Sequence, residues 1–325
     1  MGYMSTIRQL LPGKPGYTEK DLPDLSGKVY LVTGANTGIG KDVARLLYAK
    51  NATVYITTRT AEKGTATVAA LKALVPASKG RLEALTLELS DLATIKSAAA
   101  AFTAKETRLD VLFNNAGVMF PPAGSKTAQG HELQLGTNCL GHFLLTQLLT
   151  PVLVATAKNA PRASVRVVWV SSSVAEVMSP KGGVELDNLD YKRDVDYTLK
   201  YGISKAGLYY LAAEFARQHR EDGIISVALN PGNIKSDIGR TANAGMRLFR
   251  AIFTYPTVRG AYTQLFAAIS KDVGMETSGG WIVPWGRIEP IRKDLADGAK
   301  SEKDGGTGIG RKFWEWSEQQ TKAFS

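Results

Sequence analysis

The sequence has very few of the residues that form disulfides and metal sites. It contains one cysteine, Cys139, and three histidines among 325 residues. A single cysteine cannot form an intramolecular disulfide, and no pair of His or Cys residues has the spacing of metal ligands. A disulfide-stabilised domain and a zinc site are therefore excluded, and a chain of this length can bury enough surface to be stable without either.

Long hydrophobic runs are also missing. No uninterrupted apolar segment reaches the roughly 18 residues of a membrane span, and the first residues lack the apolar core of a signal peptide. We therefore expect no membrane span and a cytoplasmic protein.

Basic residues outnumber acidic ones, 40 to 30, which gives a formal net charge of +10. Such an excess can indicate a polyanionic partner. Here the basic residues are dispersed and are not interleaved with aromatic residues, as they are in single-strand binders. We expect a solvated basic surface and no nucleic-acid partner.

Short β-branched segments alternate with longer helix-like segments from Lys28 onward. The predicted strands are residues 28–33, 52–58, 81–89, 110–114, 165–171 and 225–230, and the predicted helices are 41–50, 61–75, 92–105, 130–156 and 201–219. Several strands are apolar on both sides, as expected when helices cover both faces of a parallel sheet. The predicted fold class is α/β, a single-domain, Rossmann-type, doubly wound parallel sheet with helices on both faces.

The domain boundaries follow from changes in composition. Residues 1–26 form a Pro- and Gly-punctuated N-terminal lead-in, 27–285 form one domain without an internal linker, and 286–325 form a C-terminal extension. The aromatic, charged segment 312–324 is predicted to be helical. It either caps the domain or contacts a membrane or a partner.

A glycine-rich turn follows the first predicted strand and leads directly into a helix. Its residues are Gly34, Asn36, Thr37, Gly38, Ile39 and Gly40. Glycines allow the backbone to approach a pyrophosphate closely, and the free N–H groups of a helix start favour its negative charge. The spacing differs from the general GxGxxG fingerprint, and a simple tight turn is the alternative.

The residue that would contact the adenosine ribose indicates which dinucleotide is bound. An acidic residue about 20 positions further on favours NAD, but this chain has Arg59 there, and Lys63 one turn later. A guanidinium group can pair with a 2′-phosphate, which a carboxylate would repel. The sequence therefore favours NADP(H), although Arg59 could also be an ordinary exposed arginine at a strand end.

Tyr201 and Lys205 lie four residues apart at the start of a predicted helix, so their side chains share one face. Both continue an apolar stripe and are expected to point inward. A buried ammonium group beside a phenol is expected to lower the phenol pKa, which would make Tyr201 a usable acid or base near neutral pH.

Five motifs together resemble those of the short-chain dehydrogenases/reductases. They are TGANTGIG at 33–40, NNAG at 114–117, VSSS at 170–173, YGISK at 201–205 and NPGNIKS at 230–236, in the order typical of that family. The similarity extends from Lys28 to about Trp285. In detail the chain resembles the retinol-dehydrogenase-like branch and fungal short-chain reductases.

The resemblance implies roles for individual residues. Tyr201 would donate the proton in reduction, Lys205 would hold the nicotinamide ribose, Ser172 would hydrogen-bond the substrate oxygen, and Asn138 would support a proton relay. The remaining implied cofactor contacts are Asp91 and Leu92 after the third strand, Asn114, Ala116 and Gly117 on the adenosine side, and Pro231, Gly232, Ile234 and Ser236 over the nicotinamide.

One departure from the family pattern is the distance between Ser172 and Tyr201. The 28 intervening residues are more than double the usual separation, so this polar segment must loop out. It either shapes the substrate mouth or is a passive surface loop. Residues 237–256 occupy the place of a substrate lid, and their apolar members Met246, Leu248, Phe249, Ile252 and Phe253 favour a bulky hydrophobic substrate.

The sequence thus predicts an NADP(H)-dependent enzyme that interconverts a ketone or aldehyde and its alcohol, with a secondary metabolite as a candidate substrate. Two alternatives stay open: an NADP-binding protein without redox turnover, acting as a sensor or cyclisation template, and a nucleotide-sugar epimerase. The absence of a sizeable C-terminal substrate domain speaks against the epimerase. The resemblance also implies a homodimer or homotetramer.

Overall fold

The computed structural model describes residues 8–235 and 254–325. Its centre is one sheet with the strand order β3-β2-β1-β4-β5-β6-β7-β8, in which every pair is parallel except β7 and β8. The strands are β1 (Val29–Val32), β2 (Thr53–Thr58), β3 (Arg81–Thr86), β4 (Val111–Asn114), β5 (Arg166–Val170), β6 (Ile225–Leu229), β7 (Trp281–Val283) and β8 (Arg287–Ile288). This confirms the predicted fold class.

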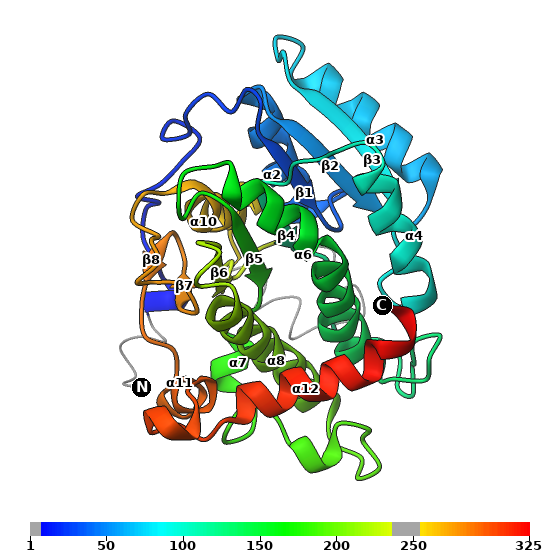
Figure 1. The fold of residues 1–325 in the computed structure, drawn as a ribbon, viewed down its shortest axis with the longest axis vertical. Helices are drawn as coiled ribbons and strands as arrows, with labels where there is room; N and C mark the ends of the chain where they lie inside the picture. Colours follow the sequence, from blue (N-terminus) through cyan, green and yellow to red (C-terminus); the bar gives the residue numbers. More distant parts are fainter. Residues whose placement is uncertain (1–7, 236–253) are drawn as a thin grey trace.

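Helices cover both faces of the sheet (Figure 1). They are α2 (Gly38–Ala49), α3 (Ala61–Leu74), α4 (Leu92–Thr103), α5 (Leu133–Leu135), α6 (His142–Lys158), α7 (Val174–Val177), α8 (Tyr197–Gln218), α10 (Thr257–Ile269), α11 (Lys293–Ala299) and α12 (Ile309–Thr321), with a π-helical turn η1 (Gly136–Gly141) and short 3-10 turns η2 (Leu186–Asn188), η4 (Glu302–Asp304) and η5 (Lys322–Phe324). Residues 8–10 are also helical.

Two hydrophobic cores result, because successive residues of a strand point to opposite faces. In β1, Val29 and Leu31 belong to the core that contains residues of α4, α6 and α8, whereas Tyr30 and Val32 belong to the core beside α2 and α10. Burial on both faces explains the apolar strands noted in the sequence.

The strand order reverses between β1 and β4. The chain proceeds from β1 outward to β2 and β3, and then returns to place β4 on the other side of β1. In open parallel sheets, ligands bind beyond the carboxyl ends of the strands at such a reversal. The glycine-rich turn after β1 and the NNAG segment after β4 meet at this point.

Some elements differ from the prediction. α8 begins one turn earlier than expected, because the Asp196 side chain accepts a hydrogen bond from Thr198 N and caps the helix. β7, β8, α7, α10 and α11 were not predicted. β7 and β8 contain only three and two residues, too few to show a periodic pattern.

The long segment from Leu133 to Lys158 is apolar and long enough, by length and composition, to cross a membrane. No such segment was expected from the sequence. In the structure 61% of its most apolar window is buried, and Phe143 and Leu144 lie in the hydrophobic core. The same features are found in a core helix of a soluble protein, so this segment is only weak evidence for a membrane span.

The C-terminal helix α12 crosses α8 and leads to the end of the chain beside α4 (Figure 1). Phe313 is completely buried in the core, and the Trp314 ring meets the Phe143 ring edge-on at 4.8 Å. A side chain at Gly207 of α8 would come within 2.8 Å of the Phe313 ring. Of the two expectations for this segment, the structure supports the cap over the domain.

The Phe313→Ala variant should lower the free energy of unfolding by about 3 kcal/mol, because it leaves a cavity between α12 and α8. Urea unfolding followed by circular dichroism measures this change. Gln319→Ala on the exposed side of α12 is the matched control and should change the free energy by less than about 0.5 kcal/mol. Equal effects of the two substitutions would contradict the packing described for α12.

Candidate active site

The glycine-rich turn has the geometry of an anion site. Gly34 and Gly38 adopt positive φ angles of 64° and 59°, which L side chains rarely adopt. Thr37 precedes α2 without a side-chain capping bond, and the first turn of α2 contains no acidic residue. The N–H groups and the positive end of the helix dipole are therefore available to a phosphate.

Close packing requires glycine at position 40. A Cβ atom there would lie 2.5 Å from Asn115 Nδ2 and 2.8 Å from the Gly34 carbonyl oxygen. Asn115 stands inside the NNAG motif, which the resemblance places on the adenosine side. Its Nδ2 also donates to the Thr33 carbonyl at 2.8 Å, so it joins the turn after β1 to the end of β4.

The Thr33 hydroxyl makes the second connection between β1 and β4. It accepts hydrogen bonds from the backbone N–H groups of Asn115 and Ala116, at 2.8 and 2.9 Å. A Cβ at Gly34 would come within 2.9 Å of Ala116 Cβ. Asn114 is different: it is completely buried, and its side chain donates to Thr146 Oγ1 of α6.

Arg59 is exposed directly after β2, and Lys63 is exposed in the first turn of α3. No acidic side chain among residues 8–235 and 254–325 forms an ion pair with Arg59.

The Asp91 carboxylate caps α4 by accepting from Ala93 N, and it also accepts from Gln129 Nε2 at 2.8 Å.

Leu92, next to Asp91, is buried, and its backbone N–H donates to Gln129 Oε1. Its side chain therefore belongs to the core, although the resemblance implied a cofactor contact at this position.

Tyr201 and Lys205 are both buried on α8, as expected. The Lys205 ammonium lies 5.6 Å from the centre of the Tyr201 ring and donates to the Val170 carbonyl at the end of β5, at 2.9 Å. Burial lowers the pKa of Lys205 to about 8.

The expected lowering of the Tyr201 pKa is not seen. Burial raises the Tyr201 pKa instead, because the enclosed phenolate would lose its hydration. The hydrogen bond of the Lys205 ammonium goes to the Val170 carbonyl. The structure therefore keeps the phenol protonated at neutral pH.

Asn138 lies in the π-helical turn η1, where the sequence predicted a regular helix. Its Oδ1 accepts from Val118 N, and its Nδ2 donates to the Val118 carbonyl and to Ser204 Oγ. A Cβ at Gly117 would lie 3.3 Å from Asn138 Oδ1 and 3.7 Å from Lys205 Nζ. Gly117, Asn138 and Lys205 therefore converge on one small region.

A histidine continues this network to β1. His142 Nδ1 lies 2.9 Å from the Asn138 carbonyl oxygen, and Nε2 lies 3.0 Å from Thr33 Oγ1. Burial lowers the pKa of His142 to about 4, so the ring is neutral. With Nδ1 donating to the carbonyl, Nε2 accepts from the Thr33 hydroxyl.

The first two serines after β5, Ser171 and Ser172, have different environments. The Ser171 side chain is buried and donates to the Lys205 carbonyl, so it holds β5 against α8. Ser172 is half-buried, and its oxygen accepts from Val174 N at 3.3 Å. The Ser172 hydroxyl is therefore the better candidate for a contact with substrate.

Phe120 is a residue that sequence reasoning missed. Its ring meets the rings of Tyr201 and Tyr197 edge-on, with centres 5.4 and 5.1 Å apart. The signal was an aromatic residue shortly after the NNAG motif. These rings form an apolar wall beside the phenol.

The segment after β6 is shaped by glycine and tryptophan. Gly232 has a φ angle of 89°, and a Cβ there would lie 2.7 Å from the Trp285 ring. Ile234 is buried and pairs with Tyr255. Ser236 lies outside the described residues, as do Met246, Leu248, Phe249, Ile252 and Phe253 of the expected lid.

Comparison with known proteins agrees with this geometry. A model of the short chain dehydrogenase family matches residues 28–184. A short-chain dehydrogenase/reductase from the fungus Phomopsis amygdali is 48% identical over 321 residues, which cover 97% of this chain and 96% of that protein. The chain belongs to the short-chain dehydrogenases/reductases. The predicted resemblance to fungal members of the family is thereby confirmed.

Solved structures have the same short-chain dehydrogenase/reductase architecture. A protein from Mycobacterium paratuberculosis, described as putative and uncharacterized, is 29% identical with a TM-score of 0.66 over 94% of this chain and 98% of that one. A blue fluorescent protein from a metagenomic library, solved in complex with NADPH, is 25% identical with a TM-score of 0.60 over 79% and 96%.

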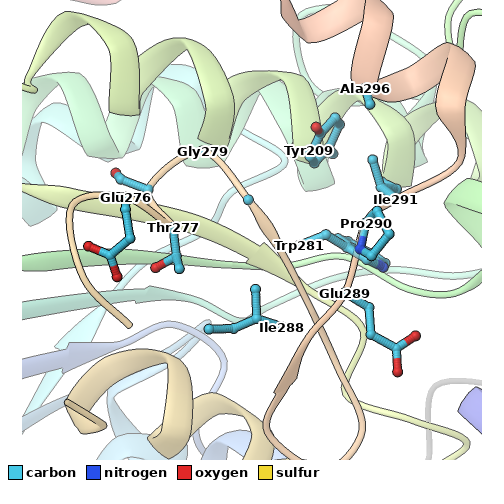
Figure 2. A pocket seen from close by; sticks show the side chains of 12 residues that line it. Tyr209, Glu276, Thr277, Gly279, Trp281, Ile288, Glu289, Pro290, Ile291 and Ala296 are labelled. Atoms are coloured by element: carbon cyan, nitrogen blue, oxygen red, sulfur yellow. The ribbon is translucent and has the colours of Figure 1, made fainter. Parts of the chain in front are cut away.

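A separate surface hollow of about 410 Å³ lies between the β7–β8 edge, α8 and α11 (Figure 2). Tyr209, Trp281, Ile288, Ile291 and Glu289 are among its lining residues. None of the candidate catalytic or cofactor-binding residues of this short-chain dehydrogenase/reductase lines it. The hollow is therefore distinct from the site at the β1–β4 reversal.

The burial of Lys205 should make the free energy of unfolding depend on pH. Its folded pKa of about 8 lies below the unfolded value of about 10.4, so between these values the unfolded chain binds more protons. Lys205 therefore destabilises the wild type by about 3 kcal/mol below pH 8, and this cost disappears as the pH rises toward 10.4. Lys205→Met should be more stable than the wild type at pH 7, and this difference should shrink at pH 9.5.

Urea unfolding at both pH values tests this expectation. Lys312→Met, at an exposed position of α12, is the control whose difference from the wild type should not change with pH. A pH-independent difference for Lys205→Met would show that the ammonium is not buried as described.

Proposed function

We propose that this protein is an NADPH-dependent carbonyl reductase that acts on bulky hydrophobic ketones or aldehydes. The observation that carries the proposal is the buried Tyr201 ring, whose centre lies 5.6 Å from the Lys205 ammonium and 5.4 Å from the centre of the Phe120 ring. Burial raises the pKa of this phenol and so favours its neutral form. A neutral phenol at neutral pH is a proton donor, which is what carbonyl reduction needs.

The residues present fit a dinucleotide. The uncapped start of α2 and the glycines at 34, 38 and 40 offer N–H groups and space for a pyrophosphate. Ala116 and Gly117 lie beside that turn, and Pro231, Gly232 and Ile234 follow β6 on the opposite side of the reversal. Arg59, with Lys63 as a weaker second cation, would bind a 2′-phosphate and favour NADPH over NADH.

When bound, the dinucleotide supplies a hydride to the carbonyl carbon of the substrate. Tyr201 donates its phenolic proton to the carbonyl oxygen, and the Ser172 hydroxyl donates a hydrogen bond to the charge that develops there. Lys205 would hold the nicotinamide ribose, and its positive charge would stabilise the phenolate that Tyr201 becomes. Asn138, held at Val118 and Ser204, would support the return of a proton to Tyr201.

The aromatic wall supports an apolar substrate. Phe120 and Tyr197 present rings next to Tyr201, and such a surface favours bulky apolar groups over small polar ones. Fungal relatives at 37–49% identity are named short-chain dehydrogenases/reductases, and a secondary metabolite is our candidate for the natural substrate.

Tyr201→Phe should lower kcat for NADPH oxidation by at least about 100-fold, because the substrate oxygen loses its proton donor. The NADPH dissociation constant should stay within a few fold. Absorbance of reduced nicotinamide, measured with a panel of apolar ketones and aldehydes, gives kcat, and fluorescence titration gives affinity. Tyr209→Phe, one turn beyond Lys205 on the same helix, is the control with unchanged kcat.

Retained turnover in Tyr201→Phe would remove this phenol from the mechanism. A wild type that binds NADPH tightly but reduces no carbonyl compound would instead favour the binding protein without redox turnover.

Arg59→Asp should weaken NADPH binding by about 10- to 100-fold and leave NADH binding nearly unchanged, because only NADPH carries the 2′-phosphate. Fluorescence titration with both nucleotides measures the two affinities. Arg311→Asp, on the exposed face of α12, controls for the general loss of positive charge. Equal NADPH affinity in Arg59→Asp and the wild type would exclude this role of Arg59.

A further inference from the structure

The N-terminal segment contributes a buried polar side chain near the candidate active site. Gln9 is only 4% exposed, and both ends of its amide are hydrogen-bonded. Nε2 donates to Glu176 Oε2 at 2.8 Å, and Oε1 accepts from Asn230 Nδ2 at 2.8 Å. Gln9 therefore joins α7 to the end of β6, across sequence separations of 167 and 221 residues.

The first of these partners belongs to α7, the short helix that begins two residues after the candidate catalytic serine. Glu176 lies in α7, whose first N–H groups, at Val174 and Ala175, donate to the side chain and the carbonyl of Ser172. At its other end the α7 segment packs on α8: a Cβ at Gly202 would lie 2.8 Å from the carbonyl carbon of Met178. Gly202 follows Tyr201 directly, so the placement of α7 sets the position of Ser172 relative to Tyr201.

The second partner belongs to the segment proposed to lie over the nicotinamide. Asn230 Oδ1 accepts from the Gly232 N–H at 3.0 Å, and the Asn230 N–H donates to the Ile282 carbonyl. A shift of the Asn230 side chain would therefore move Gly232. The Gln9 amide is the direct hydrogen-bonded link between this segment and α7.

The second oxygen of Glu176 is bonded as well. Oε1 accepts from Arg292 N at 3.0 Å, and the Arg292 guanidinium donates to the carbonyl groups of Glu176, Ser179 and Pro180. Both carboxylate oxygens and both ends of the Gln9 amide thus have partners. A buried polar network in which every member is satisfied holds its parts in one arrangement, whereas the loss of one member leaves others unpaired.

We propose that Gln9 is a positioning residue of the active site, whose amide holds the Ser172–α7 segment and the Asn230–Gly232 segment in register. The inference rests on the proposed function for the roles of Ser172 and Gly232. It assigns part of the active-site geometry to the N-terminal segment, which the sequence presents only as a lead-in.

Exchanging the side chains at positions 9 and 176 tests the hydrogen-bonded link that Gln9 makes between Glu176 and Asn230. Gln9→Glu places a carboxylate against the Glu176 carboxylate and removes the donor between them. The double variant Gln9→Glu/Glu176→Gln restores every bond: Gln at 176 donates to Glu at 9 and accepts from Arg292 N, and Glu at 9 accepts from Asn230 Nδ2. Gln319→Glu, on the exposed face of α12, is the matched control for the added charge.

The probes are NADPH and benzil, a bulky apolar diketone, assayed at a temperature at which circular dichroism shows every variant to be folded. Gln9→Glu should lower kcat by about 10- to 100-fold and weaken NADPH binding several-fold, because displacements of about 1 Å in a catalytic group have effects of this size. The double variant should return to within about 3-fold of the wild type, and Gln319→Glu should match the wild type.

Two results would overturn the proposal. One is a Gln9→Glu variant with a lower melting temperature but unchanged kcat and NADPH affinity, which would show that Gln9 only stabilises the fold. The other is a double variant as impaired as Gln9→Glu.

The outcome is separable from that of the proposed function. If the wild type reduces neither benzil nor any other carbonyl compound, the proposed function fails. The NADPH affinities of the wild type, Gln9→Glu, the double variant and Gln319→Glu then test the role of Gln9. Gly232 belongs to the segment proposed to contact the cofactor, so weaker NADPH binding in Gln9→Glu alone would still support that role.

Discussion

The hydrogen bonds around Thr33 are the constraint on which the site depends. One hydroxyl group, at the end of β1, accepts from two backbone N–H groups that follow β4. These bonds keep the glycine-rich turn and the NNAG segment together at the reversal of strand order. His142 connects the same hydroxyl to the carbonyl of Asn138, so the glycine-rich turn and the region around Asn138 share one hydrogen-bonded frame.

Burial then determines the chemistry within this frame. Lys205 and Tyr201 are enclosed by α8, β5 and Phe120, and desolvation moves their pKa values in opposite directions, down for the ammonium and up for the phenol. Relative to water, the apolar surroundings favour the uncharged amine of Lys205 and the uncharged phenol of Tyr201. Because Lys205 donates to the Val170 carbonyl, its ammonium is held by the backbone of β5 as well as by its position on the helix. The site is thereby suited to deliver a proton rather than to remove one.

Much of the fold was predictable because its signals are local. The strands β1 to β6 are β-branched segments between turns, and the helices α2, α3 and α4 lie close to their expected bounds. The helix expected over 130–156 is divided into α5, η1 and α6. β7 and β8 were missed because two or three residues carry no period, and the π-helical turn η1 was missed because its hydrogen-bond shift leaves no mark in composition. The early start of α8 depended on the capping bond of Asp196, five residues before the expected start at Tyr201.

The sequence alone determined the family, the parallel α/β architecture and the pairing of Tyr201 with Lys205, because a glycine turn and a four-residue helical spacing are written in neighbouring residues. Only the tertiary structure decided that Asn114 turns inward to Thr146, that the phenol pKa rises, and that Gln9 joins Glu176 to Asn230. Those outcomes depend on which distant surfaces pack together and exclude water. No local pattern encodes such contacts, since each partner is chosen by the folded arrangement of the whole chain.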